Sequence, residues 1–128
     1  MLSSEGLLYM CGSTQGGKLG LPEMAAKNEV RQPTLVEDLL PTESQDMSGQ
    51  QFNNKVVDVV CANSFTLAVT KSGHVFSWGT SLYGALGLGG AVSSASKPTL
   101  IQSLVSQSGD IVKVSAKYNH SLFSTNNG

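Results

Sequence analysis

The sequence predicts an all-β chain that builds one four-stranded antiparallel unit twice. Three observations predict this fold class. Blocks of sequence recur in the same order, the blocks carry the patterns of β-strands, and glycine-containing turns separate them. A sustained helical period is missing from every segment, and only residues 23–27 (EMAAK) are expected to form one short helical turn.

Two copies of the unit are visible as three pairs of aligned blocks. The first pair, GLLYMCGSTQGGKLGL over GHVFSWGTSLYGALGL, aligns without a gap at an offset of 67 residues. Two more pairs follow in the same order, QPTLVEDL over KPTLIQSL and VVDVVCANSFTLAVTKSG over IVKVSAKYNHSLFSTNNG. The predicted organisation is a first repeat over residues 1–73, with an insertion at about 41–55, and a second repeat over residues 73–128.

The blocks read as strands by their hydrophobic pattern. HVFSWG (74–79) alternates, with Val75 and Ser77 on one side and Phe76 and Trp78 on the other, and SFTLAVT (64–70) alternates in the same way. VVDVVCA (56–62) is almost entirely apolar and β-branched, which predicts a strand buried on both faces. PTLIQSL (98–104) begins with a proline, which the first residue of a strand or an edge strand tolerates.

Turns of one kind join these strands. The segments 3–6, 70–73 and 125–128 each end in a glycine, which supplies the positive φ of a tight hairpin turn. Each copy therefore holds about four short strands, which is the size of one blade of a β-propeller.

The insertion at residues 41–55 (PTESQDMSGQQFNNK) is polar and without period, and its counterpart in the second copy is much shorter. Two interpretations stay open. The simpler is a mobile, solvated loop, because insertions in surface loops cost little free energy. The sharper is a partner-binding insertion.

The stretch GSTQGGKLG (12–20) approaches the spacing of a phosphate-binding loop. Three features argue against that function. Leu19 lacks the hydroxyl that would bind Mg²⁺, Ala85 replaces Lys18 in the second copy, and Pro22 follows where a helix would have to begin. The glycines are therefore interpreted as part of the repeat.

Composition excludes several classes of function. Hydrophobic residues make up 40% of the chain and charged residues 13%, and the formal net charge is −1. No basic stripe indicates direct nucleic-acid binding, and no apolar run is long enough for membrane insertion. Cys11 and Cys61 lie in apolar runs and are interpreted as structural thiols. Without a signal-peptide pattern, we expect an intracellular protein, cytoplasmic or nuclear.

His120 is the most tempting catalytic candidate, because Tyr118, Ser121 or Cys61 could be combined with it into a nucleophile and a base. The first copy has Phe65 at the same position, which favours a buried or half-buried packing residue. His74 follows a turn and is expected to be exposed, whereas Phe76 and Trp78 are expected to pack between blades. The sequence therefore predicts no enzyme, no catalytic or metal-binding residues and no cofactor, and leaves the partner-binding residues unknown.

Taken together, these motifs resemble the regulator of chromosome condensation repeat. The second copy matches at Trp78, Gly79, Tyr83, Gly84, Leu86, Gly87, Pro98, His120 and Ser121. The first copy departs from the pattern at Cys11, Gly16 and Phe65, which replace Trp, Tyr and His. WD-type repeats are excluded because no Trp-Asp ending is present, and kelch repeats fit less well.

The resemblance implies a closed, usually seven-bladed β-propeller. Two blades cannot close a ring, so the rest is expected from the same longer chain or from other copies. It further implies a non-catalytic scaffold segment for protein–protein interaction. The alternative is a guanine-nucleotide exchange factor for a Ran-like small GTPase, which would act by wedging loops into the GTPase. The expected partner is a protein, with a small GTPase as one candidate class.

Overall fold

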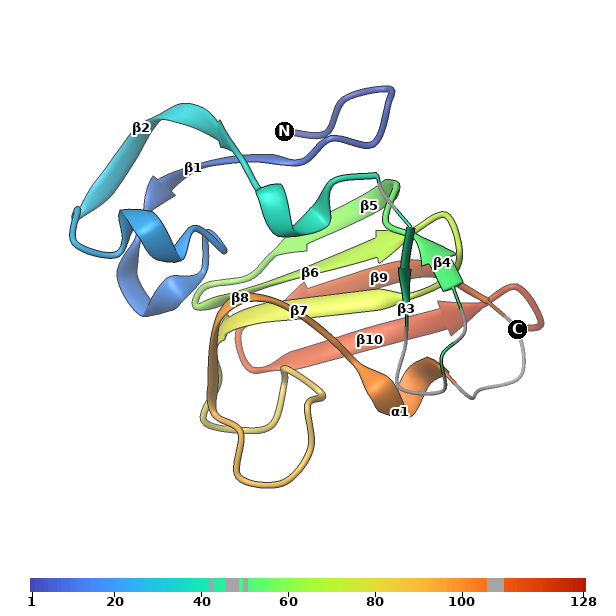
Figure 1. Ribbon diagram of the computed structural model, residues 1–128. Coiled ribbons are helices and arrows are strands. Elements are labelled where there is room, and N and C mark those ends of the chain that lie inside the picture. Colours follow the sequence, from blue (N-terminus) through green and yellow to red (C-terminus); the bar gives the residue numbers. More distant parts are fainter. Residues whose placement is uncertain (42, 46–48, 50, 106–109) are drawn as a thin grey trace.

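The structure is a computed structural model that describes residues 1–41, 43–45, 49, 51–105 and 110–128. It is all-β with antiparallel strand pairing, as the sequence predicts (Figure 1). The strands are β1 (Tyr9–Ser13), β2 (Glu29–Leu35), β3 (Glu43–Gln45), β4 (Gln51–Asn53), β5 (Val56–Cys61), β6 (Phe65–Thr70), β7 (Val75–Thr80), β8 (Ser94–Leu100), β9 (Ile111–Lys117) and β10 (His120–Thr125). Four short helical segments accompany them, η1 (Gln15–Gly17), η2 (Pro22–Met24), η3 (Glu37–Leu39) and α1 (Gln102–Val105).

A four-stranded sheet in the order β5-β6-β7-β8 forms the centre of the molecule. It differs from the predicted division, because its first two strands come from residues 1–73 and its last two from residues 73–128. The reason is the turn at 70–73, in which the Gly73 N–H donates to the Thr70 carbonyl at 2.9 Å. A turn this tight forces the strands on either side of it to pair. Sequence alignment fixes the period of a repeat but not where each sheet starts.

Two hairpins cover the two faces of this sheet. On one face, β1–β2 forms a hydrophobic core with Ala68, Phe76 and Trp78. On the other face, β9–β10 forms a second core with Phe65, Leu67 and Val75. Strands β6 and β7 are buried along almost their whole length, since they lie between both layers (Figure 1). Trp78 is fully buried, which confirms the prediction that it packs between sheets.

The flanking hairpins are counterparts of the two halves of the central sheet. The β1–β2 hairpin aligns with β7–β8, and β9–β10 aligns with β5–β6. Four aligned glycine pairs also share backbone conformation, with φ of 82° and 77° (Gly6, Gly73), 119° and 107° (Gly12, Gly79), 75° and 75° (Gly17, Gly84), and 70° and 67° (Gly20, Gly87). The sequence repeat is therefore a repeat of structure.

Two predicted strands differ from the observed ones. Strand β5 is an edge strand and is not buried on both faces, because Val57 lies at a register shift between Val56 and Asp58 and is 46% exposed. The last strand of the sheet, β8, begins at Ser94, and α1 follows where the strand was expected to continue. Pro98 lies inside β8, which is tolerated because β8 is also an edge strand.

The predicted insertion contains the short hairpin β3–β4, with Ser44 opposite Phe52. A loop without strands is therefore the wrong description of residues 43–45 and 51–53. The hairpin is anchored at its end, where the Asn53 N–H donates to Ser72 Oγ at 3.2 Å in the 70–73 turn. Residues 42, 46–48 and 50 of the insertion lie outside the described residues.

Candidate partner-binding surface

The glycine-rich turn of each copy is held against a neighbouring strand by hydrogen bonds that one backbone carbonyl of the turn accepts. The Lys18 carbonyl accepts hydrogen bonds from Thr66 Oγ1 at 2.8 Å and from Trp78 Nε1 at 2.9 Å. In the second copy, Ser121 Oγ donates to the carbonyl of Ala85 at 2.7 Å. Ala85 aligns with Lys18 and Ser121 with Thr66. The turn that resembles a phosphate loop therefore has a structural role that uses the backbone of Lys18.

Replacing Thr66 by valine tests the contribution of its hydrogen bond to the Lys18 carbonyl. Valine keeps the shape of the buried side chain but removes its hydroxyl, so the free energy of unfolding is expected to fall by about 1 kcal/mol. Thr99→Val is the matched control, because the exposed Thr99 hydroxyl bonds only to the nearby Lys97 carbonyl. Urea unfolding monitored by circular dichroism measures both variants. Equal stability of the two would show that the contact between Thr66 and Lys18 is unimportant.

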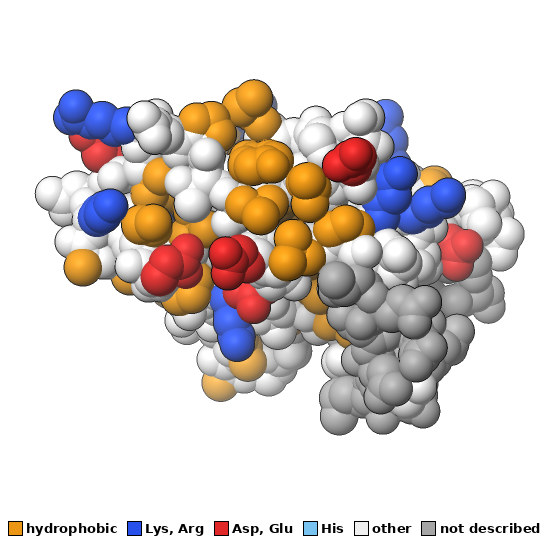
Figure 2. Space-filling model, turned by 45° about the horizontal axis from the view of Figure 1, so that its top comes forward, with side chains coloured by type: hydrophobic (Ala, Val, Ile, Leu, Met, Phe, Trp, Pro, Cys, Tyr) orange, Lys and Arg blue, Asp and Glu red, His pale blue; other side chains and the backbone are white. Residues whose placement is uncertain are grey.

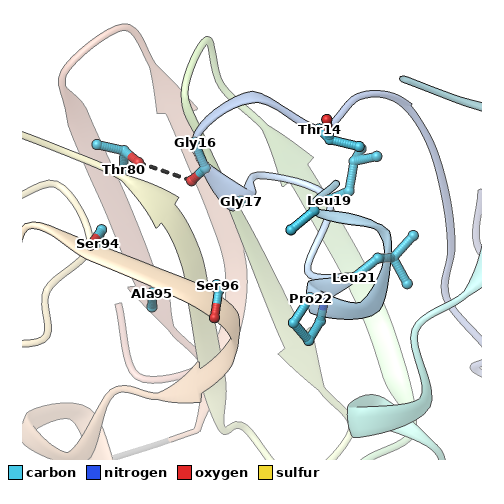
Figure 3. A pocket seen from close by; sticks show the side chains of 11 residues that line it. Thr14, Gly16, Gly17, Leu19, Leu21, Pro22, Thr80, Ser94, Ala95 and Ser96 are labelled. Atoms are coloured by element: carbon cyan, nitrogen blue, oxygen red, sulfur yellow. Dashed lines mark hydrogen bonds between the residues drawn. The ribbon is translucent and has the colours of Figure 1, made fainter. Parts of the chain in front are cut away.

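A pocket of about 310 Å³ opens where this turn meets the start of β8 (Figure 3). The buried side chains of Leu19 and Leu21 and the exposed Pro22 form its apolar part. Across from them, β8 contributes Ser94, Ala95 and Ser96. The volume lies near the lower end of ligand pockets and suits one or two side chains of a bound peptide.

One hydrogen bond ties the two sides of the pocket together. Thr80 Oγ1 donates to the Gly16 carbonyl at 2.9 Å (Figure 3). The Thr14 hydroxyl is also engaged, because it donates to the carbonyl of Lys27. The bond between Thr80 and Gly16 joins the two sequence copies, and the bond between Thr14 and Lys27 lies within the first copy, so the fold fixes the shape of the pocket.

The connection between β7 and β8 places large apolar side chains in solvent. Its two ends line the pocket, and along it Leu82 is 80% exposed, Tyr83 72% and Val92 47%. No charged residue occurs from Thr80 to Ser96. Val92 lines a separate pocket together with Leu88 and Leu100. We call the first pocket together with Leu82 and Tyr83 of the connection the rim surface.

Leu82 is exposed because of its position in the repeat, and not because the chain lacks a further sheet. Leu82 aligns with Gln15 of the first copy, which is also exposed although a following sheet packs against its turn. Adding a further sheet after the second copy would therefore leave Leu82 in solvent. Large apolar side chains that are exposed next to each other, as Leu82 and Tyr83 are, are typical of interaction surfaces.

A second apolar region lies on the side of the molecule formed by the N-terminal residues, β1 and β2. Figure 2 shows hydrophobic side chains gathered in a band on this side, with charged groups around them. Met1 and Leu2 are exposed there, and Tyr9 and Leu35 are half-buried partners across the β1–β2 pair. The charges nearby include the exposed Arg31–Glu29 ion pair at 2.6 Å.

The candidate catalytic residues do not form a site. His120 is exposed at the start of β10, so the expectation of a buried packing residue is wrong. Its counterpart Phe65 is covered by the β9–β10 layer, whereas His120 has no such layer above it among the described residues. The Ser121 hydroxyl donates a hydrogen bond to the Ala85 carbonyl. Tyr118 is exposed in the β9–β10 turn and has a φ of 49°.

Other expectations need correction in detail. Cys11 and Cys61 are free and exposed, Cys11 on β1 of a flanking hairpin and Cys61 at the end of the edge strand β5. His74 is half-buried, since its carbonyl closes the hairpin turn by accepting from the Thr70 N–H at 2.9 Å. Among the residues that the structure describes, no three metal-ligating side chains gather into a candidate metal site. In the same part of the chain, no helix is long and apolar enough to span a membrane.

The fold and the rim surface define a segment of a β-propeller whose exposed loops suit protein contacts. The regulator of chromosome condensation (RCC1) repeat model matches residues 5–69 and 72–124, and a second RCC1 repeat model matches residues 56–85. The chain therefore belongs to the RCC1 repeat family. The rim surface could not be found from sequence, because its two sides come from segments about 70 residues apart that only the fold brings together.

Relatives share the repeat within longer chains. The human E3 ubiquitin-protein ligase HERC2 is 35% identical over 129 residues, which cover 99% of this chain and 2% of the ligase. The human regulator of chromosome condensation is 34% identical over 97 residues, which cover 73% of this chain and 22% of that protein. The Xenopus laevis serine/threonine-protein kinase Nek9 is 38% identical over 87 residues, 68% of this chain and 8% of the kinase.

Solved structures agree with the fold. Yeast RCC1 (Prp20), in its crystal structure bound to Kap60, superposes with a TM-score of 0.72 at 27% identity, covering 99% of this chain and 28% of that one. Prp20p from Saccharomyces cerevisiae, in the crystal structure reported with its binding properties to Gsp1p and histones, gives a TM-score of 0.61 at 25% identity, covering 94% of this chain and 26% of that one. The chain thus spans about a quarter of these structures.

Proposed function

We propose that this chain is a non-catalytic propeller segment that binds a protein partner through the rim surface. The observation that carries the proposal is the exposed pair Leu82 and Tyr83, on an uncharged connection that runs between Thr80 and Ser94, two residues of an apolar pocket. Aromatic side chains such as tyrosine, which lose their water on binding, are enriched among the few residues that dominate the affinity of protein interfaces. The pocket suits one or two apolar side chains of the partner.

The test compares three versions of the chain against a purified partner. Affinity capture with wild-type protein identifies a partner, and titration then gives its dissociation constant. The double variant Leu82→Ser/Tyr83→Ser is expected to bind about tenfold or more weakly, because it removes the apolar anchors. Val57→Ser is the control, since Val57 is an exposed apolar residue on β5. Equal affinity of wild type and the double variant would contradict the rim surface as the binding site.

The insertion at residues 41–55 stays a second possible contact, as predicted from sequence. Deleting it and measuring the same dissociation constant separates the two surfaces. Under the present proposal, deletion leaves the affinity within about twofold of wild type, because the contacts that dominate the affinity are on the rim surface. A loss as large as that of the double variant would assign binding to the insertion.

A guanine-nucleotide exchange factor for a Ran-like small GTPase is the second candidate function. It is favoured by the 34% identity to the human regulator of chromosome condensation and by the binding of Gsp1p that is reported for Prp20p. Release of a fluorescent GDP analogue from a Ran-type GTPase tests it directly. Acceleration by the intact protein would support exchange activity, whereas tight binding without acceleration would support the scaffold.

A further inference from the structure

Tyr118 has a backbone conformation that large side chains rarely adopt. Its φ of 49° lies in the left-handed region, and it is the one non-glycine residue with a positive φ in the part of the chain that the structure describes. This conformation costs free energy, and asparagine tolerates it better than a bulky aromatic residue does. Asn119 follows directly in the same turn but does not occupy the position. The turn itself therefore does not explain a tyrosine at residue 118.

Packing within the chain does not explain the Tyr118 ring either, because the residue is 67% exposed. Its contact is with the preceding side chain, since Lys117 Nζ lies 5.7 Å from the centroid of the ring. This distance is within the range of a cation–π interaction, and Lys117 is itself exposed. A partner would therefore meet an aromatic ring and a positive charge at the same point of the surface.

The exposure of Tyr118 does not depend on where the chain ends. Tyr118 aligns with Asn63 in the β5–β6 turn of the central sheet. Asn63 is exposed although a hairpin packs against each face of its sheet. A further sheet packed against β9–β10 would therefore leave Tyr118 in solvent, as it would leave Leu82.

The β9–β10 turn lies beside the rim surface. Ser121 Oγ donates to the Ala85 carbonyl at 2.7 Å, so the start of β10 contacts the turn that follows Leu82 and Tyr83. The first copy has an equivalent contact one turn earlier, where Lys18 Nζ donates to the Asn63 carbonyl at 3.3 Å. All these turns lie at the same end of the strands, on the left in Figure 1.

The turns at this end carry positive charge without acidic residues. The four segments that contact one another there are residues 12–20, 61–65, 79–96 and 117–121. Their charged residues are Lys18 and Lys117, and they contain no aspartate or glutamate. Residues 21–28, part of which lines the pocket, add Glu23 and Lys27, whose charges cancel. A partner with negative charge is therefore complementary to this end of the molecule.

We propose that the rim surface extends to Lys117 and Tyr118, and that its partner presents an acidic segment with an apolar side chain. This inference rests on the proposed function, because it names the chemistry of the partner that the rim surface binds. The apolar side chain enters the pocket, and carboxylates beside it pair with Lys18 and Lys117. The Tyr118 ring packs against the aliphatic part of the same segment.

Replacing Tyr118 by asparagine tests the role of the ring. The dissociation constant of the purified partner is expected to rise about tenfold, because an aromatic contact is lost. The thermal unfolding midpoint is expected to stay the same or rise, since asparagine tolerates the left-handed conformation. Tyr118→Phe keeps the ring and is expected to bind within about twofold of wild type. A Tyr118→Asn protein that loses stability but keeps its affinity would contradict the assignment.

The double variant Lys18→Gln/Lys117→Gln tests the charge. We expect it to bind the partner about tenfold more weakly at low salt, and the difference from wild type to shrink at about 0.5 M NaCl, where charges are screened. Lys71→Gln/Lys113→Gln is the matched control. It removes the same charge from two exposed lysines, one of them in the 70–73 turn at the other end of the strands. Equal weakening by the two double variants would show that only net charge matters.

Two synthetic fluorescent peptides test the partner chemistry directly. One has a central leucine flanked by glutamates, and the other has glutamine in place of every glutamate. The intact protein is expected to bind the glutamate peptide at least about tenfold more tightly. Equal binding of the two peptides would overturn the acidic partner.

Comparison of the variants separates this inference from the proposed function. If Leu82→Ser/Tyr83→Ser weakens binding of the purified partner but Lys18→Gln/Lys117→Gln does not, the rim surface remains the binding site and the acidic segment is wrong. If neither double variant weakens binding, both proposals fail.

Discussion

Replacing Trp78 by alanine is expected to lower the free energy of unfolding by about 3–5 kcal/mol. Trp78 is fully buried between the central sheet and the β1–β2 hairpin, so truncation leaves a large cavity. The glycine-rich turn of the first copy packs closely against the Trp78 indole, since a Cβ added to Gly20 would lie only 2.8 Å from Trp78 Nε1. Truncation also leaves the Lys18 carbonyl with one donor in place of two.

Urea unfolding followed by far-ultraviolet circular dichroism measures this loss. Trp78→Phe is the smaller change, because phenylalanine retains much of the apolar volume but removes the indole N–H and part of the ring system. We expect Trp78→Phe to lose about a third of the stability that alanine loses. Tyr83→Ala is the exposed aromatic control and is expected to change stability by less than about 0.5 kcal/mol. A Trp78→Ala variant as stable as Tyr83→Ala would mean that the β1–β2 layer is not packed as described.

Replacing Gly79 by alanine is expected to cost more than about 3 kcal/mol, enough to leave much of the chain unfolded. Gly79 has a φ of 107°, and a Cβ there would lie 2.4 Å from the Ser64 carbonyl oxygen and 2.6 Å from the Cα of Phe65. Both atoms belong to the backbone where β6 begins, opposite Gly79 in the sheet. Neither can move away without breaking the pairing of the two most buried strands.

Gly84→Ala provides the matched comparison. Gly84 also has a positive φ, 75°, but a Cβ there would meet no atom within 4 Å. Its substitution carries only the conformational cost, about 1 kcal/mol. The difference in thermal unfolding midpoint between the two variants isolates the steric clash at Gly79. If both variants lose the same stability, backbone conformation alone explains the glycine, and the close approach of β6 and β7 is unimportant.

Much of the fold could be predicted from the sequence because the same pattern of residues occurs twice in the chain. The aligned glycines and the alternation in SFTLAVT and HVFSWG predict β6, β7 and a buried Trp78. The boundary between sheets could not be predicted in the same way. A pattern that repeats every 55–67 residues looks the same wherever the count begins, and only the pairing forced by the 70–73 turn shows that a sheet spans residue 73.

The binding surface was less accessible to prediction for a related reason. Leu19 and Ala95 are ordinary repeat residues in isolation, and they line one pocket only because β8 lies against the turn of the preceding copy. His120 shows the opposite error. Comparison with Phe65 predicted burial, but the same position on equivalent strands has different surroundings in the two copies. Equivalence in a repeat predicts backbone geometry better than it predicts environment.

The position of the central sheet across the copy boundary bears on how such a protein can be divided. Cleavage near residue 73 would open the β6–β7 hairpin and separate strands that bury the largest side chains of both cores. Cleavage at residues 101–110 would instead fall between two sheets and spare every strand ladder. We therefore expect the chain to tolerate proteolytic cleavage or new termini of a circular permutant at residues 101–110. Gain or loss of one whole sequence repeat would leave the hydrogen bonds between neighbouring repeats as they are.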